Sequence, residues 1–287
     1  MRGFFFGNWF IGLCAVALGA ESALQQHATI NGPWYHILVF SGCVAFYNHA
    51  YRAYLRTPGD GERARWFADH APQQRVVQVI LISIVCGVAL EKRELLFDLD
   101  GPDIVLVGVF LLVAVAYYGI GSVALRNIGV LKPFVLGFVW AGVVTVFPVV
   151  LAGTFPGIHV IDTGLMARLF FKNMMFCAMI AVLFDIKDHA GDHRSQLRTF
   201  VVQRGLRTTL FRIVLPLTLL GLVTFLAYGY MNGFSAMRIF WNAVPFAALL
   251  MVIFTLRKRR PILYYLGVVD GLLLLKATCG SIGMIWF

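Results

Sequence analysis

Apolar residues dominate the chain in runs long enough to span a membrane, and short polar segments separate these runs. A helix that crosses the hydrocarbon core of a bilayer needs about 20 mostly apolar residues. Windows of this length predict spans near residues 8–25, 34–54, 76–91, 103–121, 133–152, 166–186, 208–229, 238–256 and 262–283. The pattern therefore predicts an all-α, polytopic membrane bundle of about nine transmembrane helices.

Helix-breaking residues support these divisions, because interrupted backbone can reach water only outside the bilayer core. The breakers between predicted spans are Asn31-Gly32-Pro33, Gly101-Pro102, Lys132-Pro133 and Arg260-Pro261. Pro148, Pro216 and Pro245 fall inside spans and are expected to kink them. No hydrophilic stretch is long enough for a soluble domain, so residues 1–287 are predicted to form a single membrane domain.

The composition agrees with a lipid-embedded chain. Hydrophobic residues make up 60% of the sequence and charged residues only 13%, with a mean hydropathy of +0.79. The formal net charge is +10, but the basic residues are confined to short segments between apolar runs. A membrane surface and anionic ligands are therefore the expected partners, and nucleic acid is not.

The basic residues fall in every second loop. The even-numbered loops carry Arg56, Arg63, Arg65 and Arg75; Arg126 and Lys132; Lys187, Arg194, Arg198, Arg204 and Arg207; and Arg257, Lys258, Arg259 and Arg260. The odd-numbered loops are acidic or nearly uncharged. Positive charge favours the cytosolic side, so we expect the N-terminus and the even loops in the cytosol and Phe287 outside. A bacterial cytoplasmic (inner) membrane is the expected location.

Three aspartates close the sixth predicted span. Asp185, Asp188 and Asp192 follow an i, i+3, i+7 spacing, which puts them on one narrow arc of a helix. Carboxylates crowded at a membrane boundary need a cation, and oxygen ligands favour Mg²⁺ shared with substrate phosphates. This pattern predicts a diphosphate site with its metal. The alternative is a solvated helix end whose aspartates pair with Lys187, Arg194 and Arg198.

The run FDIKDHAGDHRSQLRTFVVQRG, residues 184–205, resembles the second aspartate-rich motif and following loop of the UbiA superfamily of membrane prenyltransferases. The resemblance implies transfer of a polyisoprenyl group from its diphosphate to an acceptor, with Mg²⁺ on the diphosphate. It implies a catalytic, metal-binding role for Asp185, Asp188 and Asp192. The segment from Tyr118 through Arg126 to Lys132 is similar to a family stretch that helps to hold the diphosphate. The expected phosphate-binding groups in these segments are Tyr118, Arg126, Lys132, Lys187, Arg194 and Arg198.

The family's first aspartate motif is altered. At the end of the second predicted span Asn48 is kept, but His49, Arg52 and Arg56 stand where aspartates belong. These basic residues repeat the i, i+3, i+7 spacing, so they also share one helix face. In one interpretation Asn48 and the basic residues help to bind the substrate, with the arginines replacing the charge of one metal. In the other, the basic set neutralises the acidic set without any metal.

Other polar residues lie deep within the predicted spans. Among them are Glu21, Lys172, Asp270 and Lys276. Lys172 precedes Asp185 by 13 residues, about 20 Å along a helix, so it cannot share the aspartate site. We expect Lys172 either to reach the outer interface or to pair with an intramembrane group such as Asp270.

The sequence thus predicts a UbiA-like, Mg²⁺-assisted prenyltransferase acting on a polyisoprenyl diphosphate and a small acceptor. A non-catalytic protein of the same fold that binds an isoprenoid or lipid phosphate is the first alternative. A small-solute transporter is the second, although charge concentrated at one surface does not favour it.

Overall fold

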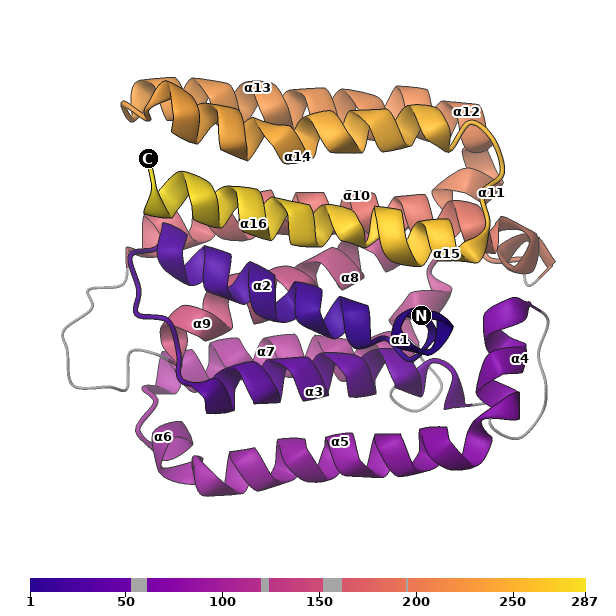
Figure 1. Cartoon of the computed structure of the whole chain (residues 1–287), viewed down its shortest axis with the longest axis horizontal. Helices are drawn as coiled ribbons and strands as arrows, with labels where there is room; N and C mark the ends of the chain where they lie inside the picture. The colour runs from indigo at the N-terminus through magenta and orange to yellow at the C-terminus, as the bar shows by residue number, and fades with distance from the viewer. Residues whose placement is uncertain (53–60, 120–123, 152–161, 195) are drawn as a thin grey trace.

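The computed structural model describes residues 1–52, 61–119, 124–151, 162–194 and 196–287. Regular structure in this part of the chain is helical, and the long helices lie side by side in one bundle (Figure 1). Seven helical rods are long and apolar enough to cross a membrane: Ala71–Glu91, Gly101–Tyr118, Lys132–Val150, Thr163–His189, Leu206–Met231, Ala236–Thr255 and Ile262–Ile285. The chain is therefore an integral membrane protein.

Each predicted span coincides with a helix or a continuous helical rod, so the predicted polytopic all-α bundle is confirmed. The single helices are α2 (Trp9–Gln25), α3 (Pro33–His49), α5 (Ala71–Glu91), α7 (Gly101–Tyr118), α10 (Thr163–Arg194) and α14 (Ala236–Thr255). The rods are α8 (Lys132–Ala141) with η3 (Gly142–Val146) and α9 (Phe147–Val150), α12 (Leu206–Thr208) with η4 (Thr209–Val214) and α13 (Leu215–Met231), and α15 (Ile262–Tyr264) with η5 (Tyr265–Val269) and α16 (Gly271–Ile285). Helices α2 and α3 have 17 residues each and are shorter than the seven spans.

Short helices mark the two ends of the bundle. Helices α1 (Arg2–Phe6), α4 (Glu62–Asp69) and α11 (Phe200–Arg204) lie at one end with α15, at the right of Figure 1. Helix α6 (Arg93–Phe97) and the C-terminus lie at the other end. The two chain termini are thus at opposite ends, as an odd number of crossings requires. That the end with α1 faces the cytosol remains a prediction.

The apolar core is formed by the central helices α2, α8, α10 and α16. Leu18, Val144, Leu183 and Leu273 are almost fully buried where these helices pack together. The peripheral helices α5, α7 and α13 instead expose large apolar side chains, including Val79, Leu112 and Val223. Apolar side chains on the outer surface are expected when lipid, and not water, surrounds the bundle.

Two of the three prolines inside spans follow a π-helical turn. Turn η3 ends just before Phe147-Pro148, and η4 ends just before Leu215-Pro216. Proline removes an N–H donor and its ring crowds the preceding turn, which a wider turn accommodates. Pro245 lies within α14 without such a turn.

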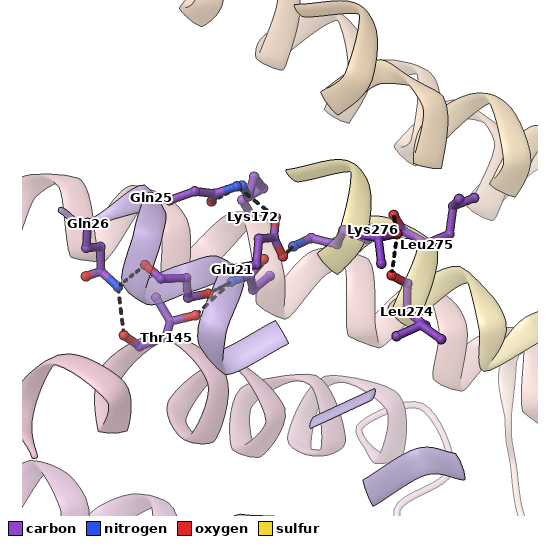
Figure 2. A network of polar contacts seen from close by, with 11 residues as sticks. Glu21, Gln25, Gln26, Thr145, Lys172, Leu274, Leu275 and Lys276 are labelled. Atoms are coloured by element: carbon purple, nitrogen blue, oxygen red, sulfur yellow. Dashed lines mark hydrogen bonds and ion pairs between the residues drawn. The ribbon is translucent and has the colours of Figure 1, made fainter. Parts of the chain in front are cut away.

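A buried polar network joins α2 to α10 and α16 (Figure 2). Lys276 Nζ lies 2.7 Å from Glu21 Oε2, and Gln25 Nε2 donates to Glu21 Oε1 at 2.7 Å. Lys172 Nζ donates to Gln25 Oε1 at 2.8 Å. Lys172 therefore finds its partner in Gln25 on α2, and the expected pairing with Asp270 is not the contact that the structure shows.

A second part of this network fixes the π-helical turn η3. Asn173 Nδ2 donates to Thr145 Oγ1 at 2.8 Å and to Ser22 Oγ at 3.1 Å. Gln26 Nε2 donates to the carbonyl oxygen of Thr145 at 2.9 Å (Figure 2). A carbonyl released by the irregular turn is thus satisfied by a side chain of α2, as buried backbone requires.

Candidate functional site

A cavity of about 1670 Å³ opens among the helix ends that carry α1, α4 and α11. Its polar lining includes the three predicted aspartates, Asp185, Asp188 and Asp192. Tyr118, Arg126, Lys132 and Lys187 also line it, so the structure brings seven of the sequence-predicted site residues to one cavity. Its apolar lining includes Ile11, Leu136, Ile180, Phe184, Leu266 and Leu273.

Lys132 lies between two of the aspartates. Its Nζ is 2.7 Å from Asp185 Oδ1 and 4.0 Å from Asp192 Oδ2. Asp185 is only 1% exposed, and its other oxygen, Oδ2, is buried without a hydrogen-bond partner. This arrangement arises because Lys132 is the first residue of α8, which packs along α10. The ammonium group holds two carboxylates together that would otherwise repel each other.

The third aspartate faces a different lysine. Lys187 Nζ lies 2.6 Å from Asp188 Oδ1, and the Asp188 side chain is 44% exposed. Burial raises the pKa of the Asp192 carboxyl above its ordinary value, and the Lys132 ammonium group counteracts part of this effect. The alternative pairing of the aspartates with Lys187 is thus present for Asp188, while Asp185 uses Lys132.

The donor set is suited to a metal that shares its coordination with a ligand. In the described residues, no group of three or more His, Cys, Asp or Glu side chains is arranged to hold a metal ion. Mg²⁺, however, is commonly bound by one or two carboxylates together with substrate phosphates. The unpartnered Oδ2 of Asp185 fits that role. The predicted three-aspartate metal site remains a prediction, and phosphate oxygens would have to complete it.

Tyr118 and Arg126 line the cavity, and the His49 ring lies beside Tyr118 without lining it. The guanidinium carbon of Arg126 lies 5.8 Å from the centroid of the Tyr118 ring, and the His49 ring lies 5.1 Å from it. Arg126 is exposed and is located in a short 3₁₀ turn, η2 (Leu125–Asn127). A cation stacked on an aromatic ring keeps its donors free to bind an anion.

Asn48, the residue kept from the first motif, has a structural partner. It is 6% exposed, and its Oδ1 accepts a hydrogen bond from Asn8 Nδ2 at 2.8 Å. Asn8 in turn accepts from Arg63 Nη2, and Arg63 also donates twice to the carbonyl oxygen of Phe6. Asn8 and Arg63 line the cavity, whereas Asn48 supports them from behind.

The remaining predicted residues are not among the residues lining the cavity. Arg52 and Arg198 are exposed, and His49 is half-buried beside Tyr118. Arg56 lies outside the described residues, and the side chain of Arg194 is not described. The ion pairs of Asp185 and Asp188 come from Lys132 and Lys187, so the described contacts do not show the first-motif arginines neutralising these two aspartates.

Sequence reasoning missed five charged residues of the cavity: Glu62, Arg63, Arg259, Arg260 and Asp270. Arg63 is only 6% exposed, and its recorded hydrogen-bond partners are neutral oxygens, so its positive charge is held at the cavity wall. Arg259 and Arg260 precede α15. Arg259 and Arg260 could have been predicted, because they lie in an even-numbered loop and all the basic even-numbered loops are expected at the same end of the bundle.

Gly129 lets two loops of the site touch. A Cβ at this position would lie 2.3 Å from the carbonyl carbon of Arg198 and 2.6 Å from the Thr199 nitrogen. The segment before α8 thus lies directly against the start of α11, where Thr199 caps the helix by accepting from Val202 N. This contact sets the loop of Arg126 and Lys132 against the loop that follows Asp192.

We expect Gly129→Ala to lower the free energy of unfolding by about 1–3 kcal/mol, because overpacking against backbone forces the two loops apart. The same change should weaken binding of inorganic diphosphate, since Lys132 and Asp192 then separate. Thermal unfolding and calorimetry in detergent measure both effects. Gly108→Ala, on the outer helix α7 with no atom within 4 Å of the added Cβ, is the matched control. Equal behaviour of the two variants would contradict the packing role of Gly129.

The fold and the cavity together define a helical integral membrane protein with a charged pocket at one end of its bundle. No protein-family model matches the sequence, and no curated protein matches it. A solved structure of a digeranylgeranylglyceryl phosphate synthase is similar over 100% of both chains, with a TM-score of 0.57 and 13% sequence identity. That synthase is a prenyltransferase of the UbiA superfamily. The fold implied by the sequence resemblance is therefore confirmed: this chain has the UbiA-type fold.

Proposed function

We propose that the chain is a membrane prenyltransferase that moves a polyisoprenyl group from its diphosphate to a small acceptor. The observation that carries the proposal is the cavity, in which Asp185, Asp188 and Asp192 face basic side chains at one end of a UbiA-type bundle. The digeranylgeranylglyceryl phosphate synthase supports the same class of reaction by its fold. The chain length of the donor and the identity of the acceptor are not part of the proposal.

The polar end of the cavity fits a diphosphate. Its basic residues are Arg63, Arg126, Lys132, Lys187, Arg259 and Arg260, and its acidic residues are Glu62, Asp185, Asp188, Asp192 and Asp270. Six cations and five carboxylates leave a formal excess of one positive charge. A diphosphate carries more negative charge than this excess neutralises. A divalent cation that arrives with the diphosphate restores the balance, as is common for phosphate ligands.

Lys132 changes its partner when the diphosphate binds. Without ligand, its ammonium group lies between Asp185 and Asp192. A phosphate oxygen that accepts from Lys132 frees the Asp185 carboxylate, whose Oδ2 is already unpartnered, to bind Mg²⁺. When bound, Mg²⁺ supplies positive charge to the leaving diphosphate. Arg126 and Lys187 add donors at the same group.

The apolar lining fits the isoprenoid chain. Ile11, Leu136 and Ile180 come from α2, α8 and α10, and Leu266 and Leu273 come from the last helical rod. A hydrocarbon chain bound along them moves from lipid to a similarly apolar surface, so van der Waals packing holds it there and water transfer does not. The same surface keeps water from the allylic carbon after the diphosphate has left.

The non-catalytic alternative rests on the altered first motif, because His49, Arg52 and Arg56 replace the carboxylates that would hold a second metal. A protein with this site could bind an isoprenoid or lipid phosphate without turnover. The two functions differ in one measurable product, inorganic diphosphate.

The test uses the full-length purified protein in lipid nanodiscs with radiolabelled prenyl diphosphates of several chain lengths and Mg²⁺. We expect release of inorganic diphosphate that is lost when Mg²⁺ is chelated and in Asp188→Ala. Asp69→Asn, an exposed carboxylate of α4 outside the cavity lining, is the matched control and should behave as wild type. Saturable binding without turnover would support the lipid-binding alternative. Solute counterflow in sealed vesicles would support the transporter and overturn the proposal.

A further inference from the structure

Asp270 is a charged residue that the proposed diphosphate chemistry does not use. It stands between the π-helical turn η5 and α16, lines the cavity, and is only 8% exposed. It follows Ile262, the first residue of α15, by eight residues, which places it about 12 Å inside the rod at 1.5 Å per residue. Asp270 therefore lies deeper along its own rod than Arg259 and Arg260, which mark the polar end of the cavity.

The carboxylate of Asp270 has no recorded hydrogen bond or ion pair with the described residues. The intramembrane lysines are engaged elsewhere, Lys276 with Glu21 and Lys172 with Gln25 (Figure 2). Of the cavity's cations, Lys187 pairs with Asp188, and Arg63 donates to Phe6 and Asn8. A buried carboxylate without a partner is costly and, within a membrane, indicates a functional site.

The backbone around Asp270 is irregular in a way that fixes the side chain. Asp270 N donates to the carbonyl oxygen of Tyr265 at 3.0 Å, across five residues, as a π-helical turn requires. Its own carbonyl oxygen accepts from Cys14 Sγ at 3.7 Å on α2. Such turns cost helix stability and occur frequently at functional sites.

A hydroxyl group stands near the carboxylate. Tyr47 lines the same cavity and lies within electrostatic range of Asp270. Trp140 Nε1 donates to Tyr47 Oη at 2.7 Å. A phenol oxygen that accepts this bond still has its own hydrogen to donate. This part of the cavity thus offers one charged acceptor and one neutral donor among apolar side chains such as Leu273 and Ile11.

We propose that Asp270 is the binding residue of the acceptor subsite, and that the acceptor presents a hydroxyl or amine, not an anionic group, to it. This inference rests on the proposed prenyl transfer. The carboxylate accepts a hydrogen bond from the acceptor's O–H or N–H. The charges of Arg63 and Lys187 reach Asp270 and offset part of its own charge. An anionic group in direct contact with the carboxylate would still be repelled, which disfavours carboxylates and phosphates at this contact.

The same contact completes the reaction without a further reagent. The allylic C–O bond breaks, and its electron pair leaves on the diphosphate. A lone pair of the acceptor oxygen or nitrogen forms the new bond to the allylic carbon. The acceptor's proton passes to the Asp270 carboxylate, which returns it to water after product release. Asp270 is therefore a catalytic residue that touches the acceptor but not the diphosphate.

The test uses three acceptors in which the end of a short side chain on a phenyl ring is the only nucleophile: 2-phenylethanol (hydroxyl), 2-phenylethylamine (amine) and 3-phenylpropionate (carboxylate). Each is offered with geranylgeranyl diphosphate and Mg²⁺ to the nanodisc-embedded protein, and KM and kcat for prenylated product are measured. Inorganic diphosphate affinity is measured separately by calorimetry. We expect the alcohol and the amine to be used with a KM at least about tenfold below that of the propionate, because hydrogen bonds to charged groups are the strong ones.

Asp270→Asn should remove this discrimination and lower kcat, while the affinity for inorganic diphosphate stays within about twofold of wild type. Asp270→Glu keeps the charge and should restore part of the preference, which a purely structural role would not do. The inference is overturned if the propionate is used as well as the alcohol, if none of the three is prenylated, or if Asp270→Asn weakens diphosphate binding as much as acceptor use. Failure of wild type to bind diphosphate would instead overturn the proposed function.

Discussion

Replacing Asp185 by asparagine is expected to lower the rate of diphosphate release by about 10²–10³-fold, the effect typical of removing one preorganised electrostatic contact. Asp185 is 1% exposed, lies 2.7 Å from Lys132, and has a second oxygen without a hydrogen-bond partner among the described residues. Asparagine keeps the shape but loses the charge that binds a divalent cation. Steady-state release of labelled inorganic diphosphate measures the effect.

Two further variants locate the cause of this loss. Lys132→Met should weaken inorganic diphosphate binding, because it removes the phosphate donor. Asp69→Asn, on the exposed surface of α4, should change neither rate nor affinity. Melting temperatures must accompany each rate, since Asp185→Asn also breaks a buried ion pair. An Asp185→Asn protein that is folded and retains more than half of the wild-type rate would sink the proposed diphosphate site.

Lys276→Met is expected to produce the largest loss of stability. It leaves Glu21, which is 1% exposed, as a buried carboxylate bonded only to Gln25 among its recorded partners. Breaking one side of a buried pair costs about 3–5 kcal/mol in soluble proteins, because the remaining charge is uncompensated. The helix at Gly280 leaves no room for Glu21 to move away, since a Cβ at Gly280 would already overlap its carboxylate. Thermal unfolding in detergent measures the loss.

The double variant Glu21→Gln/Lys276→Met tests the mechanism. It removes both charges, so it should recover most of the lost stability, and the coupling follows from a double-mutant cycle. Lys258→Met, on an exposed loop residue, is the control and should unfold as wild type does. Diphosphate binding should survive in the folded Lys276→Met protein, because the network lies about 20 Å from Asp185 along α10. A double variant as unstable as the sum of its single variants would contradict a paired network.

The polar network and the cavity divide the bundle into two functional zones. At one end, charges are paired inside the protein, with Glu21 on Lys276 and Lys172 on Gln25 (Figure 2). At the other end, Asp185 and Asp270 line the cavity, and neither Asp185 Oδ2 nor the Asp270 carboxylate has a recorded partner among the described residues. Polar groups inside a membrane protein are costly, so the paired set suits a structural role and the unpartnered set suits ligand binding.

The sequence by itself determined the class of fold and the position of its functional end. Apolar runs and breakers are local features, and each predicted span became a helix or helical rod. The spacing of Asp185, Asp188 and Asp192 also predicted that they would share one region, because helix periodicity fixes it. The family resemblance predicted that the same site would include Tyr118, Arg126 and Lys132. All three line the cavity with the aspartates.

Only the tertiary structure decided which charges meet. Lys132 and Asp185 are 53 residues apart in sequence, and Lys276 and Glu21 are 255 apart. No local sequence pattern shows that Asp185 pairs with Lys132 and not with Lys187 or Arg198. No local pattern shows that Lys172 bonds to Gln25 and not to Asp270. Helix periodicity assigns a residue to a face of its own helix, but the packing of distant helices decides what that face contacts.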